Sequence, residues 1–337
     1  MIQQFVLIGL VSISLLAVNR PSLDESADPV TGPGFNHKAI VGVEKCVDCH
    51  KHSAEVWKNT VHYKTITEMP RSPKAKEIID KMGLRRVKES LCTSCHGTEM
   101  WDTEHNEKTV EAGVSCESCH GAGMGWVNLH GEFSGKEEGE ESEEEIAKRW
   151  RASEAAGMLR PSMIADIARN CVSCHVIDHE ELVATGGHTA ASEFELLSWS
   201  QGKVRHNNFY TNGKENKIAS AERKRVLYLV GMLAEVEVLL DALGNAKAKS
   251  VYVASHATRF SKLRKKIISA AVASKEKSLL EFGKYLGTLK LSFKAREVLI
   301  PASKKVGEFL NTFSTSIDAS TLSGIDALLP DPSEYKN

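Results

Sequence analysis

Aromatic residues and prolines are scarce in this sequence, and neither sign of charge dominates it. Phenylalanine, tyrosine and tryptophan make up 6% of the 337 residues, so few rings are available to fill a large core. The formal net charge of −1 excludes a nucleic-acid-binding protein that depends on a strongly basic chain. A single long apolar run, residues 5–18, excludes a protein with several membrane spans. The remaining composition, 42% apolar and 26% charged, is typical of a globular protein.

The cysteines follow one strict pattern. All eight occur in pairs separated by two residues, and a histidine directly follows each pair. The four motifs are Cys46, Cys49 and His50; Cys92, Cys95 and His96; Cys116, Cys119 and His120; and Cys171, Cys174 and His175. Cys-x-x-Cys-His is the attachment signature of c-type haem. The two thiols form thioethers with the vinyl groups of one porphyrin, and the histidine becomes the proximal ligand of its iron.

Other uses of cysteine explain this pattern less well. A zinc site takes four ligands from paired Cys-x-x-Cys units and leaves the histidine after every pair unexplained. A redox dithiol normally occurs once, near a βαβ pattern, and a disulfide framework has no need of histidine. The sequence therefore predicts four covalently bound haem c groups, each with its iron, and leaves no cysteine for a disulfide or for catalysis.

Residues 1–20 are predicted to form a signal peptide or an uncleaved N-terminal anchor. The apolar run has the length of a signal-peptide core and is short for a membrane span, and no lysine or arginine precedes it. Either interpretation predicts an exported protein, periplasmic or extracellular, that meets a membrane only through residues 5–18 if they are not cleaved. Residues 21–34, which contain Pro, Gly and Asp, are interpreted as a linker.

The rest of the chain divides into two predicted domains. Residues 35–213 contain every haem motif, and we expect sparse secondary structure there around packed haems. Residues 214–337 contain no cysteine, and helical spacing predicts helices from residue 219 to Gly244 and over 246–273, 275–290 and 293–314. The apolar positions of the first helix are Val226, Leu229, Leu233, Val236, Leu239 and Leu240. The predicted fold class is mainly α: a multihaem cytochrome c domain followed by a haem-free C-terminal α-helical domain.

Charge is divided between these two domains. Residues 1–213 carry 22 Lys and Arg against 31 Asp and Glu, whereas residues 214–337 carry 21 against 13. The run Glu137–Glu145 is strongly acidic, and we expect a solvated loop leading into a helix near residues 146–156. Two further hypotheses are that this run is a docking patch for a basic partner, and that the charge division serves self-docking or oligomerisation.

Each haem iron has a sixth coordination position that a second histidine can fill. A second imidazole gives a low-spin electron carrier, whereas an empty position permits substrate chemistry. Nine histidines lie outside the motifs: His37, His52, His62, His105, His130, His179, His188, His206 and His256.

Three segments resemble the cytochrome c-554 family, the tetrahaem electron carriers that serve hydroxylamine oxidoreductase in ammonia oxidisers. The first is Cys46 to Lys51 with the following Trp57 to His62, and the second is Gly113 to Gly121 with His130. The third is Asn170 to His175, so the likeness covers about residues 45–212. Residues 187–207 and 223–231 also resemble a broader group of multihaem proteins with a helical tail.

The resemblance implies which histidine completes which iron. His62 would be the distal ligand of the third haem, His130 of the first and His206 of the fourth. The namesake's second haem lacks a distal ligand, but His188 has no clear counterpart there and is available for the second iron, whose proximal ligand is His96. The other histidines are expected at the surface (His52), in structural roles (His37 and His256) or as alternatives to His188 (His105 and His179).

The preferred hypothesis is electron transfer between a redox protein donor and a redox protein acceptor through four bis-histidine haems. The chain is then a carrier and not an enzyme. A first alternative is an enzyme of nitrogen-oxide or hydroxylamine chemistry at an open second haem. A second alternative is a structural subunit of a larger redox assembly, held there by the helical tail.

Overall fold

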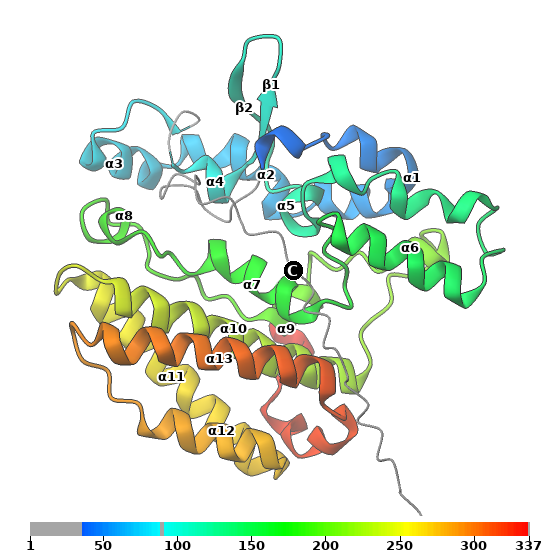
Figure 1. Ribbon diagram of the computed structural model, residues 1–337. Coiled ribbons are helices and arrows are strands. Elements are labelled where there is room, and N and C mark those ends of the chain that lie inside the picture. The colour runs from blue at the N-terminus through cyan, green and yellow to red at the C-terminus, as the bar shows by residue number, and fades with distance from the viewer. Residues whose placement is uncertain (1–35, 88–90, 336–337) are drawn as a thin grey trace, which may run out of the picture.

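The computed structural model describes residues 36–87 and 91–335. The expected signal peptide or anchor and the linker after it lie outside the described residues. The described chain is mainly helical, which confirms the predicted fold class. Figure 1 shows α1 to α6 on one side of the molecule, α10 to α13 on the other, and α7, α8 and α9 between them.

The helices of the haem-motif region are short. They are α1 (Glu44–Lys58), α2 (Val61–Glu68), α3 (Pro73–Met82), α4 (Thr93–His96), α5 (Cys116–His120), α6 (Glu143–Ala155), α7 (Ile164–His175), α8 (Glu180–Ala184) and α9 (Leu196–Ser200). In α4, α5 and α7 the helix ends at the motif histidine, and in α1 the motif histidine His50 interrupts the helical backbone with φ −107° and ψ 38°. A helical turn brings the two cysteines of a motif onto one face, as attachment to one porphyrin requires.

A β-hairpin that the sequence analysis did not predict separates the second motif from the third. Strand β1 (Thr98–Asp102) pairs antiparallel with β2 (Glu107–Ala112), and the hairpin projects from the molecule (Figure 1). Asn106 has φ 53° at the turn, a left-handed conformation that asparagine tolerates better than most residues. The hairpin returns the chain directly to Ser115 and the third motif.

The acidic run leads into a helix as expected. Ser142 caps α6, and Ser142 and Glu145 form a capping box. Glu143, Glu144 and Glu145 occupy the first helical turn, where negative charge interacts favourably with the helix dipole.

The C-terminal part is a helical layer built around one central helix. Its helices are α10 (Ala221–Asn245), α11 (Val251–Ser274), α12 (Lys277–Thr288) and α13 (Arg296–Ser316), which confirms the predicted pattern. Helix α10 contacts α7, α9, α11 and α13, so residues on most of its circumference are buried. All six predicted apolar positions of α10 are buried. A Cβ at Gly231 would lie 2.6 Å from Cβ of Leu196, so glycine permits the close approach of α9.

One apolar core runs across the expected boundary at residue 213. Ala168 and Val172 of α7 and Leu197 of α9 belong to the same buried cluster as Leu233 of α10. Nε of Arg169 on α7 also donates to Glu237 of α10 at 2.7 Å. The helix that carries the fourth motif is therefore packed directly on the C-terminal layer, and the division into two domains stays a prediction. Within residues 36–87 and 91–335, every helix is too short or too polar to cross a bilayer.

Candidate haem-binding sites

Each motif histidine lies opposite one of the other histidines. The ring centroids of His50 and His130 are 6.0 Å apart, and those of His96 and His188 are 6.3 Å apart. The remaining pairs are His120 with His206 at 6.0 Å and His175 with His62 at 6.2 Å. Metal–nitrogen bonds to histidine are about 2 Å long, so two imidazoles on opposite sides of one metal have centroids about 6 Å apart. All four pairs fit this spacing.

Two of these pairs differ from the pairing implied by the resemblance. His130 lies at the first motif and His188 at the second, as expected. His62 lies at the fourth motif instead of the third, and His206 lies at the third instead of the fourth. The reason lies in the fold: the segment after α9 returns toward α1 and α5, whereas α2 faces α7 through the rings of His62 and His175. The role of these eight residues as iron ligands stays a prediction.

The second ring nitrogen of several histidines is held by a hydrogen bond. Nδ1 lies 3.0 Å from the Leu159 carbonyl oxygen in His120, and 2.7 Å from that of Val127 in His130. The corresponding acceptors are Thr189 O for His188 at 2.8 Å and Val204 O for His206 at 2.7 Å. A carbonyl can only accept, so Nδ1 carries the proton and Nε2 keeps its lone pair for a metal. The residues therefore fit a bis-histidine haem iron.

The cysteines place the four motifs in a spatial order. The thiol of Cys46 lies within hydrogen-bonding reach of Cys116, which brings the first and third motifs together. Cys95 lies in the same way beside Cys174, which brings the second and fourth together. Asn170, just before the fourth motif, donates its side-chain amide to the carbonyl oxygen of Ser118 at 2.8 Å. The motifs are therefore arranged in the order first, third, fourth, second.

Comparison with known proteins agrees with this set of motifs. The family described as cytochrome c554 and c-prime matches residues 45–121, which contain the first three motifs. The chain is also 35% identical over 97 residues to cytochrome c-554 of Nitrosomonas europaea. Over the matched segment, the chain is similar to the cytochrome c-554 family.

The match covers only part of each protein. It includes 26% of this chain and 41% of the length of the Nitrosomonas europaea cytochrome c-554. No solved structure matches the chain. The likeness to the cytochrome c-554 family supports a c-type cytochrome with covalently bound haem c in the matched segment.

Burial favours the neutral form of five of the facing imidazoles. It lowers the pKa of His50, His62, His96 and His120 from the ordinary value, and that of His175 to about 4. These rings are therefore uncharged at neutral pH, which is the form that binds a metal.

The other five histidines have different surroundings. The Nδ1 atom of His105 is 2.7 Å from Asp102 on the exposed hairpin, and His179 accepts from Leu182 N as the cap of α8. His52 lies near Glu55, and His37 lies near Glu99. His256 is fully buried in α11 with Nδ1 2.8 Å from the Tyr252 carbonyl oxygen.

Several residues around the pairs have no signal in the sequence. The Phe194 ring stacks on that of His175 at 4.4 Å, and Ser192 Oγ lies 2.7 Å from His175 Nδ1. The Leu159 carbonyl oxygen bonds to Nδ1 of His120, which is 39 residues away in the sequence, so only the fold brings them together. A Cβ at Gly121, which has φ 86°, would lie 2.2 Å from the Gly157 carbonyl oxygen, so this glycine admits the Leu159 segment.

Glu117, inside the third motif, is a buried anchor that the sequence analysis also missed. Its carboxylate accepts the backbone N–H of Val41 at 3.0 Å, of Gly42 at 2.9 Å and of Gly123 at 2.6 Å. These charge-assisted hydrogen bonds fix the chain before α1 against the third motif.

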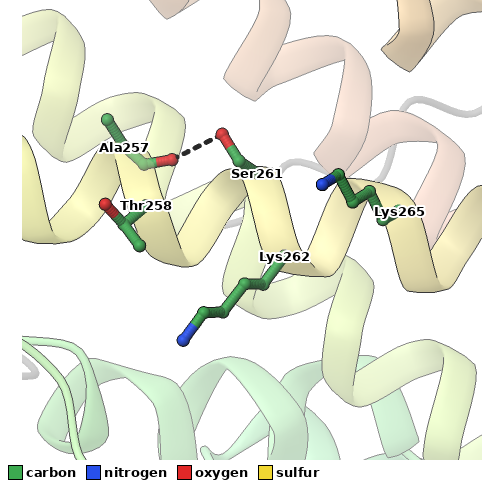
Figure 2. A pocket seen from close by; sticks show the side chains of 5 residues that line it. All are labelled: Ala257, Thr258, Ser261, Lys262 and Lys265. Carbon is green, nitrogen blue, oxygen red and sulfur yellow. Dashed lines mark hydrogen bonds between the residues drawn. The ribbon is translucent and has the colours of Figure 1, made fainter.

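Two other observations concern competing sites. Within residues 36–87 and 91–335, no group of three or more His, Cys, Asp or Glu side chains converges as a metal site made by protein alone, as zinc would need. Figure 2 shows a surface hollow lined by Ala257, Thr258, Ser261, Lys262 and Lys265. All five belong to α11 and none is His or Cys, so the hollow is separate from the haem motifs.

Proposed function

We propose that this protein is an exported tetrahaem c-type cytochrome that passes electrons between a donor and an acceptor protein through four bis-histidine haems. The observation that carries the proposal is that every motif histidine faces a second histidine at 6.0–6.3 Å. When bound, the haems supply iron that accepts and releases one electron at a time. Two histidines of the chain would hold each haem iron, which favours low-spin iron.

We prefer a carrier to an enzyme with an open second haem because of His188. Its ring is 6.3 Å from that of the motif histidine His96, and its Nδ1 is held by the Thr189 carbonyl oxygen. A second imidazole at this position excludes a small-molecule substrate from the iron. The contiguous order of the motifs also supports a carrier, because electrons need short steps between neighbouring haems.

The acidic run Glu137–Glu145 favours a redox partner with a basic surface. Arg149 of α6 donates to the His130 carbonyl oxygen at 2.6 Å and forms a two-nitrogen ion pair with Glu141. The acidic segment is thereby tied to the histidine that faces the first motif. Glu137, Glu138 and Glu140 are exposed, so their charge is free to attract a cationic redox protein.

Electron paramagnetic resonance of the oxidised protein tests the proposal. We expect only low-spin ferric signals, together with a mass that corresponds to four attached haems. A high-spin ferric signal in the wild type would instead support the open-site enzyme. Fewer than four haems would contradict the tetrahaem assignment.

A variant with Glu137, Glu138 and Glu140 changed to Gln tests the partner. Its affinity for a cationic monohaem cytochrome c should fall about tenfold at low salt, and added salt should remove the difference. The matched control changes the exposed Glu281, Glu297 and Glu308 to Gln and should bind like the wild type. Equal affinity of both triple variants and the wild type would exclude docking at the acidic run.

A further inference from the structure

Three N–H donors beside the histidine pairs are buried and have no hydrogen-bond partner within the described residues. They are Nε1 of Trp126, Nε1 of Trp199 and Nε of Arg205. Trp126 is 5% exposed, so bulk water does not reach its ring freely. Buried donors are nearly always paired in folded proteins, and an unpaired one points to an acceptor that the polypeptide does not supply.

Each of these donors lies beside a different pair of facing histidines. The Trp199 ring is 5.3 Å from that of His175 and 6.3 Å from that of His62. Because it contacts both members of one pair, it lies beside the space between them. The Trp126 ring meets His130 edge-on at 5.3 Å with an interplanar angle of 77°.

Arg205 is the residue before His206, which faces His120. Its Nη1 donates to the Gln201 carbonyl oxygen at 2.9 Å, so the guanidinium group is anchored while Nε is left unpaired. The three donors thus surround the first, third and fourth motif sites.

Unpaired donors are not a general property of the tryptophans in this protein. Nε1 of Trp57 donates to the Val114 carbonyl oxygen at 2.8 Å. Among the described residues, the buried indole nitrogens without a partner are those of the two tryptophans whose rings contact the facing histidines.

The chemistry of the missing acceptor follows from the group that the histidines would hold. The edge of a haem is apolar except for its propionate carboxylates, which are anionic and accept hydrogen bonds only. A buried carboxylate is costly unless N–H or O–H groups donate to it.

We propose that Trp126, Trp199 and Arg205 are the propionate-binding residues of the first, fourth and third haems. The inference rests on the bis-histidine haems proposed above. It adds an acceptor class, the carboxylate, and a separate hydrogen-bond donor for each of three haems.

The experiment compares Trp126→Phe and Trp199→Phe with a matched control, Trp57→Phe, in the haem-loaded full chain. Phenylalanine keeps a ring and removes only the N–H donor, and the control loses a hydrogen bond to a protein carbonyl instead. At pH 8 the propionates are ionised, and losing a donor leaves more unscreened negative charge near the iron, which stabilises the ferric state. Each test variant should therefore lower the reduction potential of a single haem, whereas the control should lower none.

A crystal structure of the haem-loaded wild type gives an answer that does not depend on the variants folding. Indole nitrogens within about 3 Å of propionate oxygens would support the proposal. Indole nitrogens bonded to water or to nothing would overturn it, as would potentials in both test variants that equal those of the wild type. A protein whose mass shows four haems while these contacts are absent would refute this inference alone; absence of the haems would refute the proposed function.

Discussion

Replacing His206 by glycine separates the two possible pairings of the distal histidines. In the structure His206 faces His120 at 6.0 Å, so the variant should lose the sixth ligand of the third haem. The pairing implied by the family resemblance assigns the loss to the fourth haem at His175. Glycine leaves a space of imidazole size, and the Val204 carbonyl oxygen that held Nδ1 of His206 remains there to bind a replacement.

The expected magnitude is one haem of four. Ferric spin quantification should give one high-spin iron, because His50, His96 and His175 keep their partners at 6.0, 6.3 and 6.2 Å. Added imidazole should restore the low-spin spectrum, and crystals soaked in imidazole identify the iron that binds it. The matched variant His62→Gly should open the fourth haem. Imidazole found at His175 in the His206→Gly crystals would refute the pairing in the structure.

Three further changes test contacts around the motifs. Asn170→Ala removes the hydrogen bonds to the Ser118 and Cys119 carbonyl oxygens; it should destabilise the protein by about 1 kcal/mol in urea unfolding and weaken magnetic coupling between the third and fourth haems. Glu117→Gln puts an amide N–H group where backbone N–H groups converge on the carboxylate. The variant should lower the free energy of unfolding by about 1–3 kcal/mol. An unchanged unfolding midpoint would exclude this anchoring role. Arg225 donates to Asp326 and so lowers the pKa of that carboxyl below its unfolded value. The stabilisation by this ion pair is complete above the pKa that Asp326 has in the unfolded chain. It is lost as the pH falls through the lower pKa of Asp326 in the folded protein. Asp326→Asn should therefore be less stable than the wild type by up to about 1 kcal/mol at pH 7, and the difference should disappear once the pH falls below the folded-state pKa of Asp326.

The C-terminal helices could be predicted from the sequence because their stability depends on periodic burial. Leu229, Leu233 and Leu240 recur on the helix and are fully buried, and Ser220 caps its first turn. Such local signals need no knowledge of the rest of the chain. The hairpin at residues 98–112 was missed because its polar, partly exposed strands lack a continuous apolar alternation.

The haem motifs could also be read directly, whereas the partner of each motif histidine could not be derived from spacing. The chemistry of attachment confines two cysteines and one histidine to five consecutive residues, but a distal ligand can come from any segment. His62 is 113 positions from His175, and His206 is 86 positions from His120, so their meeting depends on how α2, α7 and the segment after α9 pack. The resemblance supplied three pairs: the pair at the first motif agrees with the structure, and the other two differ from it. His188 had no counterpart in the family and was assigned to the second motif as the best remaining histidine, where the structure places it.

The fourth motif connects the haem-motif region with the C-terminal helices. Helix α7 presents Cys171, Cys174 and His175 to the motif region, while Ala168 and Val172 enter the core that α10 dominates. The helices of the haem-motif region are mostly short, and α7 buries its apolar side chains against the C-terminal helices. Packing on the C-terminal helices fixes the position of α7, and the Asn170 side chain links α7 to the third motif. The C-terminal helices therefore help to set the positions of the third and fourth motifs through their contacts with α7.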